Sequence, residues 1–150
     1  MAKETYPIPT SNPNAYMSIS FLLMWVVSAL AISIASSLYP ETYVLGTMSL
    51  SRLSALLLSS GVLAWVTTLL MPVFTEIEIR KKMVLAPQHW VLGYLIINVV
   101  ALWIIARFAD SLGFGVASWM AVVGLAIVLD LAQGMTMMGF GEITKRMKKS

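Results

Sequence analysis

The sequence contains no cysteine and only one histidine, His89. Without cysteine the chain cannot form disulfides, Cys-type zinc sites or thiolate-ligated iron–sulfur clusters, and it has no thiol nucleophile. A single histidine excludes a bis-histidine haem within the chain. The sequence also has no glycine-rich phosphate loop and no nucleophile–base pair. We therefore predict no catalytic residues, no metal site, no cofactor and no enzyme activity.

Charge is scarce as well. Only 11% of the 150 residues are charged and 59% are hydrophobic, whereas a soluble domain has about 25% charged residues. Such a chain cannot cover its own surface with polar groups in water, so we predict a membrane protein. The net charge of +3 does not indicate nucleic-acid binding, because the basic residues lie at the ends of apolar runs. The first apolar run lacks the short core and exit site of a signal peptide, and we expect it to remain as an anchor.

Four apolar runs are long enough to cross a bilayer as helices. About 20 residues are needed to cross about 30 Å of hydrocarbon, and a lipid-exposed strand would leave its backbone groups unpaired. The sequence therefore predicts a single all-α membrane domain over residues 1–150. Its helices are expected at roughly 17–38, 50–73, 89–109 and 115–138.

The basic residues orient these helices. Two of the ten, Arg52 and Arg107, lie in or beside the two outer connections, and the other eight lie at the termini or in the 74–88 loop. The positive-inside rule then predicts cytoplasmic termini, in a bacterial inner membrane. The loop FTEIEIRKKMVLAPQ alternates apolar and charged residues, which indicates a short amphipathic element or small hairpin at the headgroups. A charged loop that touches lipid phosphates is the alternative.

The two halves of the sequence are similar. WVVSALAISIASSL (25–38) aligns with LIINVVALWIIARF (95–108), which places Ser28 opposite Asn98. ALLLSSGVLA (55–64) aligns with AVVGLAIVLD (121–130). Both halves run in the same sense across the membrane, so we predict two pseudo-repeated helical hairpins related by an axis along the membrane normal.

Several short motifs carry a family resemblance. The second predicted helix ends in LLMPV, with Pro72, and is followed by LGYLIINVVALWIIARF, which holds Leu92-Gly93 and Ile97-Asn98-Val99. Over residues 20–135 the chain resembles the phage-holin-like four-helix family of small bacterial membrane proteins (YvlD-like). It departs from that family in its charged loop after Pro72 and in Ala64, where the family usually has asparagine. The resemblance implies a four-helix membrane protein, and lysis activity does not follow from it.

Asp130 is the sharpest feature of the sequence. Counted from Gly115, it lies about 22 Å along the last predicted helix. An ionised carboxylate there costs about 2.5–3.5 kcal/mol on insertion scales, so Asp130 should be protonated, paired or in contact with water. Tyr94, Thr67 and Thr68 lie at a similar depth and could bond to it. Gln133, three residues later, would extend the same site.

Two roles for Asp130 remain open. It could be a proton or cation station, or it could anchor helices to one another, within the chain or in a partner. We favour the anchor. Asn98, near the middle of the third predicted helix, and Ser28 are expected to join helices in the same way.

Small residues recur at four-residue spacing and predict close helix packing. These residues are Ala29, Ser33 and Ser37 in the first helix, Ala55 and Ser59, and Ser60 and Ala64, in the second, and Ala117 and Ala121 in the fourth. They offer more packing faces than one four-helix bundle needs. We therefore expect contact with other subunits or with further copies of the chain.

Three residues near the helix ends are expected at the membrane interface. Arg107 and Asp110 are three apart and predict an ion pair at the outer end of the third helix. His89 begins that helix beside Trp90. It could ligate a pigment or metal, although a lone interfacial histidine is usually solvated.

Three functions fit this sequence. The favoured one is a non-catalytic structural or assembly subunit that packs in a larger membrane complex. The alternative is a small homo-oligomeric pore or ion pathway, holin-like, that uses Asp130. The third is pigment binding through His89. The expected partners are the lipid bilayer and other membrane-protein subunits or further copies, and no nucleic acid.

Overall fold

The structure is a computed structural model in which residues 13–149 are described. Within this range the chain forms four long helices. They are α1 (Pro13–Leu38), α2 (Arg52–Lys81), α3 (Pro87–Arg107) and α5 (Trp119–Lys149). Each is long and apolar enough to cross a membrane. The expectation of a helical protein with four helices long and apolar enough to cross a membrane is thereby confirmed.

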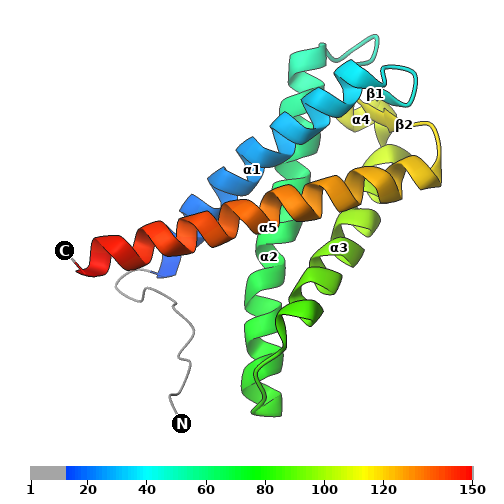
Figure 1. The fold of residues 1–150 in the computed structure, drawn as a ribbon. Coiled ribbons are helices and arrows are strands. Elements are labelled where there is room, and N and C mark those ends of the chain that lie inside the picture. Colours follow the sequence, from blue (N-terminus) through cyan, green and yellow to red (C-terminus); the bar gives the residue numbers. More distant parts are fainter. Residues whose placement is uncertain (1–12, 150) are drawn as a thin grey trace.

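The four helices form a ring of neighbours. Helix α1 packs on α2 and α5, and α3 packs on the same two helices. Among the described residues, α1 and α3 do not pack on each other, and neither do α2 and α5. Figure 1 shows that all four helices meet at one end of the molecule. Towards the other end, α1 and α5 run together away from α2 and α3.

A small β-ribbon closes the end where the helices meet, which we call the ribbon end. Strand β1 (Tyr43–Leu45), from the α1–α2 connection, pairs antiparallel with β2 (Phe114–Val116), from the α3–α5 connection. The Tyr43 hydroxyl donates to the Ala121 carbonyl oxygen at 2.9 Å. Burial raises the pKa of that hydroxyl, and the nearby Tyr39 raises it further. The ribbon therefore ties the two helical hairpins together through backbone pairing and a neutral phenol.

The ribbon corrects two predicted helix boundaries. The fourth helix, expected from residue 115, begins at Trp119, because residues 114–116 are extended. The third helix, expected to reach residue 109, ends at Arg107. A separate short helix α4 (Ala109–Leu112) follows and stops at Gly113, whose φ of +76° favours glycine.

The charged segment after Pro72 also differs from its prediction. Residues 74–81 continue helix α2, and only residues 82–86 connect it to α3. Arg80 and Glu76 form an i, i+4 ion pair at 2.8 Å on this extension, which supports the helix. The alternation of apolar and charged residues was too short to distinguish a strand period from a helical one. Lys82, in the left-handed conformation, ends the helix.

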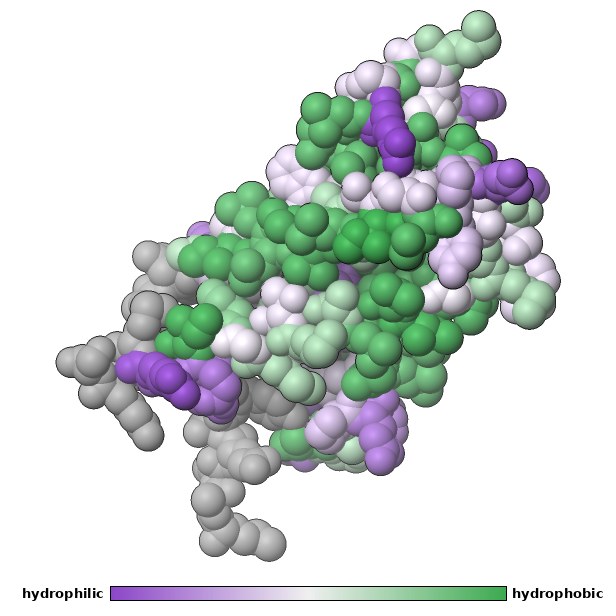
Figure 2. All heavy atoms as spheres, turned by 45° about the horizontal axis from the view of Figure 1, so that its top comes forward, coloured by the Kyte–Doolittle hydropathy of each residue, from purple (hydrophilic) through white to green (hydrophobic). Residues whose placement is uncertain are grey.

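The core lies near the ribbon end, and the outer surface is apolar. Buried side chains from all four long helices and from β2 make up the core, including Ile32, Leu63, Leu102, Phe114 and Leu129. Large hydrophobic side chains are also exposed on every long helix. Figure 2 shows them as a broad hydrophobic band between hydrophilic groups. This surface is the one that a lipid-embedded bundle presents to acyl chains.

Candidate functional site: a buried amide cluster and a nearby carboxylate

Three polar side chains meet inside the bundle and form what we call the amide cluster. Asn98 of α3 donates from Nδ2 to Gln133 Oε1 of α5 at 3.0 Å. Gln133 in turn donates from Nε2 to Ser28 Oγ of α1 at 3.1 Å. Asn98 and Ser28 are fully buried, and Gln133 is 2% exposed. The cluster therefore connects three helices through two hydrogen bonds shielded from solvent.

Gln133 is the centre of this cluster. The sequence comparison placed Ser28 opposite Asn98, and in the structure both side chains bond to Gln133 from different helices. Gln133 forms no hydrogen bond with Asp130, because its amide bonds to Ser28 and Asn98. The sequence did contain a signal for this cluster. A glutamine side chain both donates and accepts hydrogen bonds, and Gln133 lies at a depth in the membrane similar to that of Ser28 and Asn98.

The cluster leaves one acceptor unused. Asn98 Oδ1 is buried and has no hydrogen-bond partner among the described residues. An amide oxygen can accept two hydrogen bonds. The cluster can therefore hold helices together, but it contains no ionisable group that could exchange a proton.

Asp130 lies outside the cluster, about one turn from Gln133 on α5. Its side chain is partly exposed, and it forms no hydrogen bond or ion pair with any described residue. Tyr94 on α3 is close enough to interact with it electrostatically. The Tyr94 ring itself packs near Phe74 and Trp90, with centroids 6.4 Å and 6.3 Å away.

The expected threonine partners of Asp130 do not bond to it. Thr67 donates to the Leu63 and Ala64 carbonyl oxygens of its own helix, at 3.0 Å and 3.1 Å. The Thr68 hydroxyl is buried without a hydrogen-bond partner in the described part of the chain. The reason is positional, since α2 does not pack against α5 in the ring of helices.

A second polar contact joins α1 to α2. Trp25 Nε1 donates to Ser60 Oγ at 3.0 Å and to the Leu57 carbonyl oxygen at 3.2 Å. Beyond this contact, away from the ribbon end, an open groove of about 400 Å³ lies between the two helices. Its lining is mainly apolar and consists of Met17, Ser18, Phe21, Leu22, Trp65, Thr68 and Leu69.

The small residues occupy different places. Ala55 and Ser59 are buried on α2, as are Ser60 and Ala64. On α1 the predicted stripe is displaced by one residue. Ser28, Ile32 and Ser36 are buried, whereas Ala29 and Ser33 are partly exposed and Ser37 is exposed. Ala117 is exposed and precedes α5, and Ala121 is partly exposed near its start.

The residues expected at the interface are exposed, and the expected ion pair is absent. Arg107 and Asp110 form no salt bridge in the described part of the chain, because they belong to different helices, α3 and α4. The Arg107 guanidinium instead lies over the Trp103 ring, 5.7 Å from its centroid. His89 is exposed in the first turn of α3.

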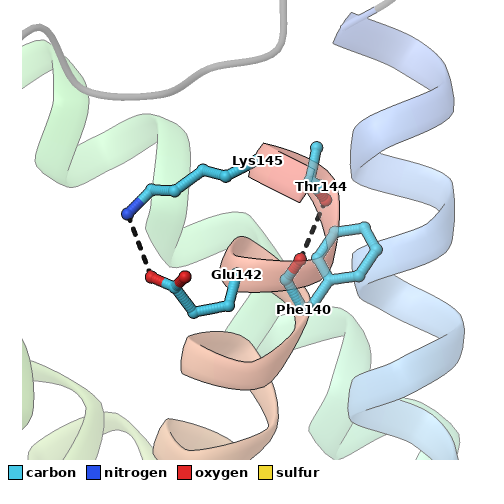
Figure 3. Close-up of polar contacts among 4 residues, drawn as sticks. All are labelled: Phe140, Glu142, Thr144 and Lys145. Atoms are coloured by element: carbon cyan, nitrogen blue, oxygen red, sulfur yellow. Dashed lines mark hydrogen bonds and ion pairs between the residues drawn. The ribbon is translucent and has the colours of Figure 1, made fainter. Parts of the chain in front are cut away.

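The last turns of α5 are polar and locally stabilised. Lys145 pairs with Glu142 at 3.2 Å, and the Thr144 hydroxyl donates to the Phe140 carbonyl oxygen at 2.8 Å (Figure 3). Both contacts lie within α5. Glu142 thus has a basic neighbour on its own helix, unlike Asp130.

Comparison of the chain with protein-family models, curated proteins and solved structures found no match. The described residues contain no group of three His, Asp or Glu side chains that could hold a metal ion. The chemistry that the site offers is therefore hydrogen bonding inside the bundle and one carboxylate near its surface.

Proposed function

We propose that this protein is a non-catalytic subunit that packs in, or helps to assemble, a larger membrane complex. One observation carries the proposal. The side chains that could line a polar path, Asn98, Gln133 and Ser28, bond to one another in the bundle interior. Asp130, an acidic residue in the apolar part of α5, is partly exposed at the helix surface, where another chain could reach it.

The described part of the chain supports this role. Residues 13–149 form four apolar helices and their short connections, with a broad apolar surface. The uneven distribution of lysine and arginine supports cytoplasmic termini in a bacterial inner membrane. A chain of this kind acts by packing against other membrane helices.

The test is the native mass of the protein after extraction from its own membrane in mild detergent, with identification of the chains that co-elute. We expect a stoichiometric complex with at least one different chain. Asn98→Leu is a useful variant, because weakening the amide cluster should reduce recovery of the complex. A homo-oligomer without any other chain would overturn the proposal.

A homo-oligomeric pore is the second candidate, and the unbonded carboxylate of Asp130 is the observation that favours it. In a ring of copies, Asp130 would face a shared lumen. Ion flux into vesicles should then be lost in Asp130→Asn while assembly is retained. Flux that is absent in the wild type, or unchanged in the variant, would exclude this candidate.

A further inference from the structure

One face of α5 carries Asp130 towards the surface. At 3.6 residues per turn, five residues of α5 fall within about 100° of one another around the helix and share this face. They are Ile127, Asp130, Leu131, Gly134 and Met138, which we call the Asp130 face. Ile127, Leu131 and Met138 are exposed, and Asp130 and Gly134 are partly exposed. The buried residues Leu129 and Gln133 flank Asp130 in the opposite direction around the helix, towards the core.

Gly134 leaves open space at the centre of this face. A Cβ atom added there would meet no atom of the described structure within 4 Å. Glycine is not needed for the local backbone, since Gly134 lies within a regular helix and has no positive φ. In a membrane, a small residue with open space above it allows a second helix to approach closely.

Asp130 adjoins this space, one turn away on the same face. It forms no ion pair or hydrogen bond with the described residues. Acidic groups within membrane spans usually pair with basic groups or with other polar groups. The described basic residues of this chain lie at helix ends, at Arg52, Lys81 and Arg107 among others, so a cation that pairs with Asp130 would come from another chain.

A second copy of this chain is a poor occupant. Copies in one membrane share their orientation, so a symmetric contact through this face would bring two Asp130 carboxylates to the same depth. Two ionised carboxylates at short distance in a medium of low dielectric constant repel each other, so at least one would have to be protonated, a cost that a positive side chain avoids. Charge complementarity favours a helix that carries a positive side chain.

We propose that the Asp130 face binds a transmembrane helix of another subunit, which places an arginine or lysine side chain against Asp130 and crosses α5 at Gly134. This inference rests on the proposed function, and it names the partner's chemistry. The guanidinium or ammonium group would supply the hydrogen bonds that the Asp130 carboxylate lacks, and the glycine would let the two backbones come close.

The test uses the purified full-length protein in phospholipid vesicles and a synthetic polyleucine transmembrane helix with one central arginine. Association is measured by energy transfer between labelled protein and labelled peptide. The all-leucine peptide is the reference. We expect the arginine peptide to bind about tenfold more tightly, and Asp130→Asn to remove that difference. Glu142→Gln, which changes an acidic residue about 18 Å further along α5 that already pairs with Lys145, should leave it unchanged.

The steric part of the proposal has its own matched pair of variants. Gly134→Leu and Gly139→Leu each add a large side chain where a Cβ meets nothing within 4 Å, so both should fold. Only Gly134 lies on the Asp130 face, since residue 139 is turned to another side of the helix. Binding of the arginine peptide should weaken about tenfold in Gly134→Leu and stay unchanged in Gly139→Leu.

Three results would overturn the inference: equal binding of the arginine and all-leucine peptides, arginine-peptide binding that survives Asp130→Asn, or equal effects of the two glycine variants. Self-association that Gly134→Leu abolishes, without arginine-peptide binding, would assign the face to a second copy. The proposed function is tested independently, because the mass of the native complex is measured without the peptide. A native complex with other chains, combined with no arginine preference, refutes only this inference.

Discussion

Replacing Gln133 tests whether the amide cluster holds the bundle together. Gln133→Met keeps an unbranched side chain of similar length but removes the carbonyl and the amide. It deletes two buried interhelical hydrogen bonds, to Asn98 and to Ser28. It also leaves the Asn98 Nδ2 group without its acceptor, on a residue whose Oδ1 is already unpaired in the described structure.

The magnitude follows from measured hydrogen bonds in membrane proteins. Such a bond contributes on average about 0.6 kcal/mol and at most about 1.7 kcal/mol. Two bonds give a loss of about 1 to 3 kcal/mol in the free energy of unfolding. The stranded Asn98 amide moves the expectation towards the upper end of that range. Asn98→Leu should cost less when Gln133 is already methionine, because the partners are then both apolar.

The assay is reversible unfolding of the purified protein in mixed micelles, applied to both single variants and to the double variant. We expect a coupling free energy of about 0.6 to 1.7 kcal/mol between Gln133 and Asn98. Thr67→Val is the control, because the buried Thr67 hydroxyl bonds only within its own helix. It should cost less than Gln133→Met. Unchanged stability in Gln133→Met, or strictly additive effects in the double variant, would refute the reasoning.

Three further predictions concern the ribbon end and the α1–α2 contact, and the same unfolding assay measures each. Gly113→Ala should cost about 1 to 3 kcal/mol, because φ is +76° and the new Cβ would clash with Ala55 Cβ; Gly134→Ala, in open space within a helix, should cause no loss of stability. The raised pKa of Tyr43 means that the unfolded chain loses this proton first as pH rises through 10. Stability should therefore fall above pH 10 until the folded phenol also ionises, and Tyr43→Phe should reduce that fall. Trp25→Phe removes the indole donor to a serine hydroxyl of α2 and should cost about 1 kcal/mol; a Trp25→Phe protein as stable as the wild type would contradict this.

The segment after Pro72 shows where local sequence reasoning was insufficient. Ile77 and Ile79 alternate with charged residues, which indicated a short amphipathic element or small hairpin, with a charged loop as the alternative. The structure shows a helix to Lys81. In the same segment, Glu76 and Arg80 form an ion pair at the i, i+4 spacing of a helix. A window of a few residues cannot separate these periods, and continuity with the preceding helix decided the outcome.

The polar residues show a second limit. Asp130 is the most costly group to bury in the membrane, yet it is Gln133 that connects three helices. A charged residue stands out in a hydropathy pattern. The contribution of a buried amide to helix packing, by contrast, depends on which helices bring hydrogen-bond partners to it. Asn98 and Ser28 lie 35 and 105 residues from Gln133, respectively, so only the order of helices around the ring identifies the cluster.

The sequence by itself determined that the chain has four helices long and apolar enough to cross a membrane, because both properties are read from the length and composition of each run. Only the tertiary structure decided which face of each helix is buried, such as Ser28, Ile32 and Ser36 in place of Ala29, Ser33 and Ser37. The physical reason is that lipid and protein interior are both apolar. In water, the hydrophobic pattern along a helix distinguishes its buried face from its exposed face. In a bilayer this pattern is weak, so the packing of the helices against one another decides which face is buried.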